Sequence, residues 1–132
     1  MTNLGDYLKE AMSTPFEWGK HDCCTFCANW MGVHIGADLL EGWRGEYETE
    51  SEAMRLLHER GGIEAVFERQ IAGRADRVTR PAKGSVGIMD AGDSLVGAIY
   101  SGERWVVFSE RGVRAIPHRD GLMIAMWGLP NG

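Results

Sequence analysis

The chain has 132 residues, of which 44% are hydrophobic and 25% are charged, and its formal net charge is −5. This length is typical of one domain with a substantial core, so we predict a single domain over residues 1–132. The acidic balance, without any run of Lys and Arg, argues against binding along nucleic-acid phosphates. No apolar run approaches the length needed to span a membrane, and the polar N-terminal segment predicts no signal peptide.

Four helices are predicted in the N-terminal half, about residues 1–72. Apolar residues recur at helical spacing after Asn3, and Asp22 and Thr49 are good N-cap residues for two further helices. Gly36 ends the second helix, and a capping box begins at Thr49. The predicted helices are residues 4–12, about 22–35, about 49–60 and 63–71.

From Gly84 the pattern changes to short β-branched or aromatic runs separated by turn-type clusters. The five predicted strands are residues 85–90, 95–100, 104–109, 113–116 and 122–127. Their close spacing predicts an antiparallel meander over about residues 84–129, after an Arg-rich surface loop at residues 73–83. Helices first and strands second are typical of an α+β fold with the helices packed on one face of the sheet.

All three cysteines lie between Phe16 and Trp30. Two of them are adjacent, which does not make a disulfide framework, so we expect synthesis in a reducing cytoplasm. Because Asp22 is the predicted N-cap, Cys23 falls at the first helical position, where the helix dipole stabilises a thiolate. Cys23 is therefore a candidate nucleophile. It also begins a stripe at helical spacing that we expect to face the core. The stripe comprises Cys23, Cys27, Trp30 and His34.

Cys24 and Cys27 form a Cys-x-x-Cys pair, with His21 nearby. This set is half of a zinc or iron–sulfur site, and no second pair follows at a usual spacing. A redox pair at a helix start is the other alternative, but the helix does not follow a strand in a βαβ unit. We favour thiols packed under a helix, and predict no metal and no cofactor.

Four short motifs together resemble the NlpC-type cysteine peptidases, papain-like enzymes that cut peptide stems in bacterial cell walls. The motifs are Phe16-Glu17-Trp18-Gly19, Asp22-Cys23-Cys24, Pro81-Ala82-Lys83-Gly84-Ser85-Val86 and Leu95-Val96-Gly97-Ala98-Ile99-Tyr100. The resemblance implies a papain-like α+β fold, with the cysteine at a helix N-terminus and the helices packed on about five antiparallel strands. It implies Cys23 as the nucleophile in the hydrolysis of peptidoglycan stem peptides.

The chain also resembles, in size and element order, the short tail-module proteins of bacteriophages and prophages. That resemblance implies synthesis in a bacterial cytoplasm, protein partners in a tail tip or baseplate, and a final place in the virion.

The chain departs from the peptidase pattern at the residues that would activate the thiol. The position of the family's catalytic histidine is Leu95, the position of the polar residue that orients it is Val107, and Gly84-Ser85 lacks the family's aspartate. Leucine and valine can neither accept a proton nor orient a base. The resemblance therefore implies a structural protein with a degenerate peptidase site. The alternative is an active cell-wall peptidase or amidase with Cys23 as nucleophile and another base.

The four histidines are the alternative bases. His21 is two residues before Cys23, and His118 lies between the last two predicted strands, so both are candidates. His34 is about 16 Å along the helix from Cys23 and is interpreted as a core or C-cap residue. His58, near the end of the third helix, is expected at the surface.

Two other features concern surfaces. Trp43 lies between glycines in a loop and is the tryptophan that we expect to be exposed, at a partner surface or groove. We expect most of the other tryptophans in the core. The acidic run Glu46–Glu52 is interpreted as a solvated segment before the third helix.

Overall fold

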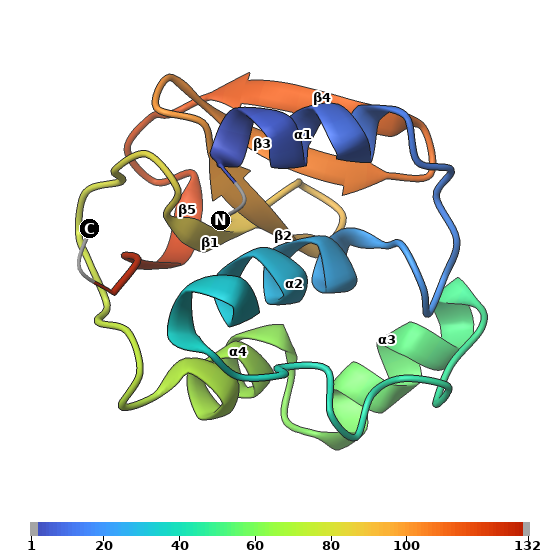
Figure 1. Ribbon diagram of the computed structural model, residues 1–132. Coiled ribbons are helices and arrows are strands. Elements are labelled where there is room, and N and C mark those ends of the chain that lie inside the picture. The colour runs from blue at the N-terminus through green and yellow to red at the C-terminus, as the bar shows by residue number, and fades with distance from the viewer. Residues whose placement is uncertain (1–2, 131–132) are drawn as a thin grey trace.

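The computed structural model describes residues 3–130 and shows four helices followed by a five-stranded antiparallel sheet (Figure 1). The predicted α+β class is confirmed, and some of the element bounds shift by a single residue. The helices are α1 (Leu4–Met12), α2 (Cys23–Ile35), α3 (Glu50–Glu59) and α4 (Ile63–Ile71). The strands are β1 (Val86–Asp90), β2 (Leu95–Tyr100), β3 (Arg104–Ser109), β4 (Gly112–Pro117) and β5 (Met123–Trp127). In the described part of the chain, no helix is both long and apolar enough to cross a membrane.

The strand order is β4-β3-β2-β1-β5, so the predicted meander is correct for β1 to β4 and wrong for β5. The last strand returns past the others and pairs with β1, with Val86 opposite Trp127. The reason lies in β1, where successive residues from Val86 to Met89 are all buried. A strand buried on both faces is a central strand and needs a hydrogen-bonded neighbour on each side.

The main core lies between the helices and the inner face of the sheet, where Ile88, Ile99 and Val106 are buried. Helix α2 runs through the middle, with α1 on one side of it and α3 and α4 on the other (Figure 1). The buried Trp30 fixes α2 to the turn before β1, because its indole N–H donates to the Gly84 carbonyl at 2.9 Å. Helix α2 is therefore positioned from several sides, and so is the cysteine at its first residue.

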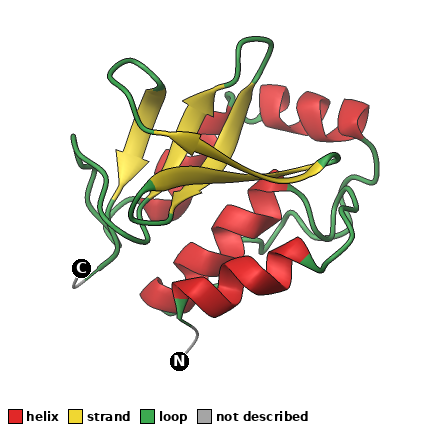
Figure 2. Ribbon diagram, turned by 90° about the horizontal axis from the view of Figure 1, so that it is seen from above, coloured by secondary structure: helices red, strands yellow, loops and turns green. Residues whose placement is uncertain are grey.

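The outer face of the sheet carries a second buried cluster. No helix belongs to this cluster, and the sheet supplies its own cover. The β3–β4 hairpin runs across the direction of the other three strands (Figure 2). Trp105 of β3 is fully buried there. The buried members of the cluster are Met89, Ala98, Trp105, Val107, Leu122 and Met126.

The predicted surface loop at residues 73–83 pairs with the free edge of β5. The Val78 N–H donates to the Met126 carbonyl at 3.0 Å, and the Gly128 N–H donates to the Asp76 carbonyl at 3.0 Å. Covering an edge strand in this way removes unpaired backbone groups that would otherwise invite edge-to-edge association.

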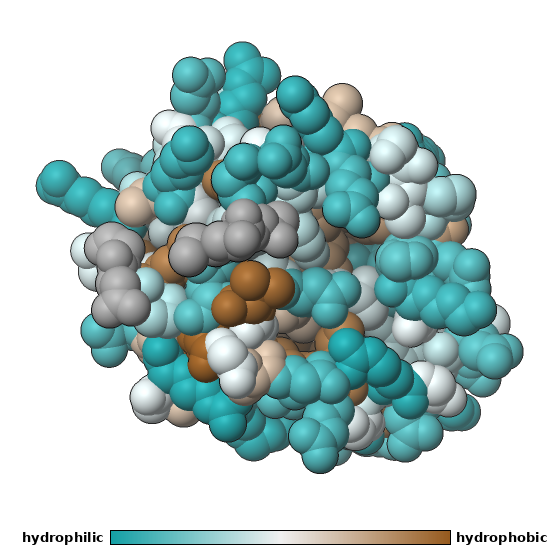
Figure 3. All heavy atoms as spheres, viewed as in Figure 1, coloured by the Kyte–Doolittle hydropathy of each residue, from teal (hydrophilic) through white to brown (hydrophobic). Residues whose placement is uncertain are grey.

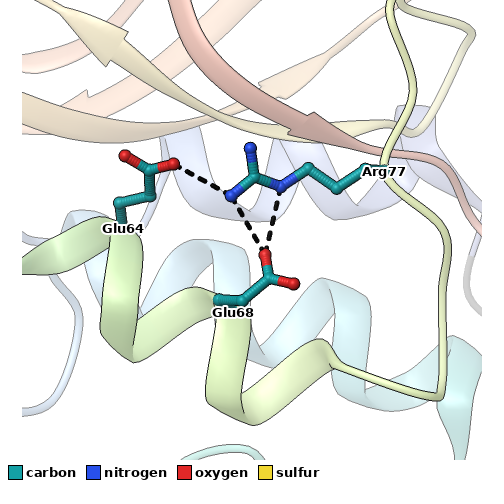
Figure 4. A network of polar contacts seen from close by, with 3 residues as sticks. All are labelled: Glu64, Glu68 and Arg77. Carbon is teal, nitrogen blue, oxygen red and sulfur yellow. Dashed lines mark hydrogen bonds and ion pairs between the residues drawn. The ribbon is translucent and has the colours of Figure 1, made fainter.

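Arg77 connects the same segment to α4. Its guanidinium contacts Glu64 at 2.9 Å and Glu68 at 3.0 Å (Figure 4). It also lies 5.0 Å from the centre of the Trp127 ring. Both ion pairs are about half exposed, so solvent screening leaves them a small share of the stability.

Candidate functional site

The start of α2 is fixed by a capping box around Asp22. One carboxylate oxygen of Asp22 accepts the N–H groups of Cys24 (3.0 Å) and Thr25 (2.9 Å). The Thr25 hydroxyl in turn accepts the Asp22 N–H at 2.7 Å. This local geometry places Cys23 at the first position of α2, as predicted from Asp22 as the N-cap residue.

The second carboxylate oxygen of Asp22 accepts the Tyr47 hydroxyl at 2.6 Å and the Gly19 N–H at 2.9 Å. Asp22 is only 1% exposed, and its four donors replace the water that burial removes. Burial, together with the hydrogen bond to this carboxylate, raises the pKa of Tyr47 above its ordinary value. Tyr47 therefore stays protonated and acts as a donor. We call Gly19, Asp22 and Tyr47 the Asp22 cluster; it joins three separate stretches of chain.

The sheet opens next to Cys23. Strand β3 pairs with β2 only at Ile99–Val106 and Tyr100–Trp105, and the two strands separate beyond these pairs. The first turn of α2 lies at this opening, against β2 at Gly97. A Cβ on Gly97 would be 2.8 Å from the Cys27 sulfur. A glycine is therefore what permits α2 to approach the sheet here.

We predict that Gly97→Ala destabilises the protein by about 1–3 kcal/mol, the usual cost of overpacking a core. If the Cys27 sulfur is the limiting contact, Gly97→Ala/Cys27→Ala should lose less stability than the two single changes combined. Urea unfolding measures all three variants. Gly5→Ala, at an exposed position of α1, is the matched control and should be neutral or slightly stabilising. Additive losses would show that the clash at Gly97 does not involve Cys27.

A cleft of about 660 Å³ lies over Cys23. Its walls come from the segment before α2, from α3, from β2 and from the β3–β4 hairpin. Met54 (42% exposed) and Leu95 (39% exposed) are apolar wall residues open to solvent. The Trp18 indole N–H donates to Glu110 at 3.2 Å, which joins two of the walls. The charged lining residues are Asp22, Glu50, Asp93, Glu110, Arg111 and Arg114.

The three thiols are free, and they differ in acidity. A hydrogen bond from the Cys24 thiol lowers the pKa of Cys23; burial and Asp22 oppose this effect, and the backbone N–H of Gly97 adds to it. The same thiol–thiol hydrogen bond, followed by burial, raises the pKa of Cys24. Burial is the main cause that raises the pKa of Cys27. Cys23, which is half-buried in the cleft floor, is therefore the thiol that ionises first.

Neither candidate histidine lies beside Cys23. His21 is exposed and lines a different hollow, between α1 and α2. His118 lies on the outer face of the sheet, where its Nδ1 accepts the indole N–H of Trp105 at 3.0 Å. The sheet separates His118 from Cys23. The unexpected position of β5, beside β1, therefore does not bring this histidine to the cleft.

The other two histidines are also away from the cleft. His34 is half-buried at the end of α2, packed against Trp30 with ring centres 4.3 Å apart, and burial lowers its pKa. Gly36, not His34, is the C-cap residue. His58 is exposed in the last turn of α3, as expected.

Leu95 and Val107, two of the positions at which the chain departs from the pattern that it resembles, lie on different faces of the sheet. Leu95 is in the wall of the Cys23 cleft. Val107 borders the same opening but packs in the outer cluster with Trp105, because its neighbours Val106 and Phe108 belong to the inner core. The side chains at positions 95 and 107 therefore point to opposite faces of the sheet, although both residues border the cleft.

The prediction that Trp43 is exposed is wrong. Trp43 is 8% exposed, and the Arg60 guanidinium lies 4.2 Å from its ring centre. Gly42 and Gly45 adopt positive φ and turn the loop back, so the indole fills space between the helices. There it borders a small apolar cavity of about 40 Å³ together with Cys24 and Cys27.

Within residues 3–130, no group of three or more His, Cys, Asp or Glu side chains is arranged to hold a metal ion. Sequence reasoning missed Tyr47 and the closeness of Gly97 to α2. An isolated glycine inside a strand pattern is the usual sign of such a close approach and was the available signal for Gly97. For Tyr47 there was none, because its partner is 25 residues away.

The family model described as "Domain of unknown function (DUF6950)" matches residues 1–128. Neither the curated proteins nor the solved structures gave a match. The chemistry of the cleft is therefore the basis for a functional argument.

Proposed function

We propose that this chain, which belongs to the DUF6950 family, is a papain-like, NlpC-type domain whose cleft binds a polypeptide segment without cleaving it. The supporting observation is the lining of the cleft. Cys23 faces it from a helix N-terminus, Leu95 occupies the position of the base, and no histidine of the described residues lines it. A cysteine hydrolase needs a base within hydrogen-bond reach of the sulfur and a second group that orients the base.

The cleft suits binding in two respects. Its exposed apolar residues, Met54 and Leu95, offer contact area for apolar side chains, and Arg111 and Arg114 are available to polar groups at its margin. In this proposal the domain is a structural component of a larger assembly. The resemblance to tail-module proteins suggests a phage tail tip or baseplate, with the protein made in the bacterial cytoplasm and carried in the virion.

The proposal is tested by incubating the protein with peptidoglycan stem peptides, the substrates of the enzymes it resembles. We expect no cleavage that depends on Cys23, so the wild type and Cys23→Ala should give identical product profiles. Leu95→Asp should weaken any binding of these peptides, since it places a charge on an apolar wall. Cleavage that Cys23→Ala abolishes would overturn the proposal.

A second candidate, an active peptidase or amidase, is favoured by the position of Cys23 at a helix N-terminus in the cleft, together with the lowered pKa of its thiol. In this mechanism the thiolate attacks an amide carbonyl, and the leaving amine must receive a proton. The structure provides few groups that could assist the attack on the carbonyl or the protonation of the amine. Asp22 takes up the N–H groups of Cys24 and Thr25, so these two donors are not available to an oxyanion.

The pH profile of Cys23 alkylation distinguishes the two candidates. Because the Cys24 thiol stabilises the Cys23 thiolate, we expect a midpoint below the free-cysteine value of about 8.5. A lowered pKa means more thiolate at each pH, hence faster reaction with iodoacetamide, followed residue by residue with mass spectrometry. Cys24→Ala should move the midpoint upward, and Cys27→Ala is the matched control. A midpoint that stays low in Cys24→Ala would reveal another activating group and favour the peptidase.

A further inference from the structure

Two segments of opposite charge lie on opposite sides of the molecule (Figure 1). Residues 41–52, before and at the start of α3, contain five glutamates and one arginine. Residues 74–83, the segment that covers the β5 edge, contain four basic residues and one aspartate. The face seen in Figure 3 is hydrophilic toward both sides, and its hydrophobic surface is gathered over α2. The molecule thus carries one acidic segment and one basic segment on opposite sides.

The charged side chains at both ends are free to interact with a partner. Glu46, Glu48 and Glu50 are exposed and make no ion pair with any described residue. We call these three residues the acidic corner. At the other end Arg77 is committed to Glu64 and Glu68.

The remaining cations at that end, Arg74, Arg80 and Lys83, are exposed and form no ion pair within residues 3–130. They border a groove of about 450 Å³ between the residue 73–83 segment and the chain after β5. We call it the basic groove. Val78 and Leu129 contribute apolar surface to it. A groove with cationic margins and apolar lining suits an acidic segment, since charge steers the encounter and apolar contact holds it.

We propose that the acidic corner of one copy of this chain docks into the basic groove of a second copy. The occupant is chosen by charge complementarity, because the exposed glutamates of the acidic corner match the unpaired cations of the groove. Since the two surfaces differ and lie on opposite sides, the contact is heterologous, and its repetition gives a ring or a filament. The inference does not depend on whether the Cys23 cleft is catalytic.

Sedimentation velocity of the full chain at two ionic strengths tests the proposal. At about 0.01 M the Debye length is about 30 Å, and at about 1 M it is about 3 Å. We expect head-to-tail oligomers at low salt and monomers at high salt. A wild type that remains monomeric at low salt across the accessible protein concentrations overturns the proposal.

Charge reversal identifies the two surfaces. Arg74→Glu/Arg80→Glu and Glu46→Lys/Glu48→Lys should each weaken self-association at low salt by about a hundredfold or more, because like charges then face each other. A mixture of the two variants should assemble again, since each reversed surface meets an opposite charge on the other variant. This rescue also shows that both variants fold.

Lys9→Glu/Arg104→Glu, which changes the net charge as Arg74→Glu/Arg80→Glu does but lies outside the groove, is the matched control. Loss of assembly in the control, or a mixture that stays monomeric, overturns the proposal.

Discussion

Replacement of Asp22 by alanine is expected to destabilise the protein by about 4 kcal/mol. Loss of a helix N-cap alone costs about 0.5–2 kcal/mol. Here the change also leaves the Tyr47 hydroxyl and the Gly19 N–H unpaired, and a buried donor without a partner costs about 1–3 kcal/mol. The carboxylate is 1% exposed, so water cannot replace it without rearrangement. Urea unfolding measures the loss.

Two comparisons separate the contributions to this loss. Thr49→Ala removes the N-cap of α3, whose side chain accepts a single N–H at an exposed site, so it should cost only the ordinary capping energy. Tyr47→Phe removes one donor to Asp22, and combining it with Asp22→Ala should cost less than the two losses added. If Asp22→Ala costs no more than Thr49→Ala, the cluster is a simple cap and the buried donors find other partners.

The elements of this fold could be predicted because their signals are local. Asn3 and Thr49 each precede an apolar pattern of helical period, Asp22 precedes a segment that is apolar on most sides, and each of the three caps the helix that follows. The position of β5 could not be predicted, because pairing between β5 and β1 is a contact between distant segments. A run of apolar residues predicts a strand, but it does not indicate which edge of the sheet that strand occupies. The uniform burial of β1 is visible only once both neighbours are in place.

The position of Cys23, the candidate nucleophile, could be predicted from the sequence, whereas the surroundings of its thiol could not. Cys23 at a helix start follows from one cap residue. The lowered pKa of its thiol depends on Cys24, its neighbour in the chain, and on Gly97 of β2, which comes close only through packing. The prediction for Trp43 is wrong for a related reason. Flanking glycines indicate a turn, but they do not show whether the Trp43 side chain points to solvent or to the core.

Gly19→Ala is expected to cost about 3 kcal/mol or more, from two separate causes. Gly19 has φ of +87°, and a left-handed backbone costs an alanine about 1–2 kcal/mol. In addition, the new Cβ would lie 2.3 Å from the carbonyl oxygen of Tyr47. A backbone atom cannot rotate away, so the Tyr47 segment must move and its hydrogen bond to Asp22 is lost.

Gly45→Ala is the matched control for this prediction. Gly45 has a similar φ of +78°, and none of residues 3–130 lies within 4 Å of an added Cβ, so only the backbone cost applies. The difference between the two alanine variants in urea unfolding isolates the contact with Tyr47. Equal losses would mean that the Tyr47 carbonyl moves at no cost.

Because Gly19 and Asp22 belong to one cluster, Gly19→Ala/Asp22→Ala should lose clearly less stability than the two single changes added. Such a result would show that Trp18-Gly19 and Asp22-Cys23 form one capping structure, which the hydrogen bond from Tyr47 to Asp22 completes. This capping structure stabilises the fold whether or not a general base lies beside the Cys23 thiol. If the proposed function is correct, this stabilising role is a physical reason for the Trp18-Gly19 and Asp22-Cys23 motifs to be present in a domain that does not cleave its ligand.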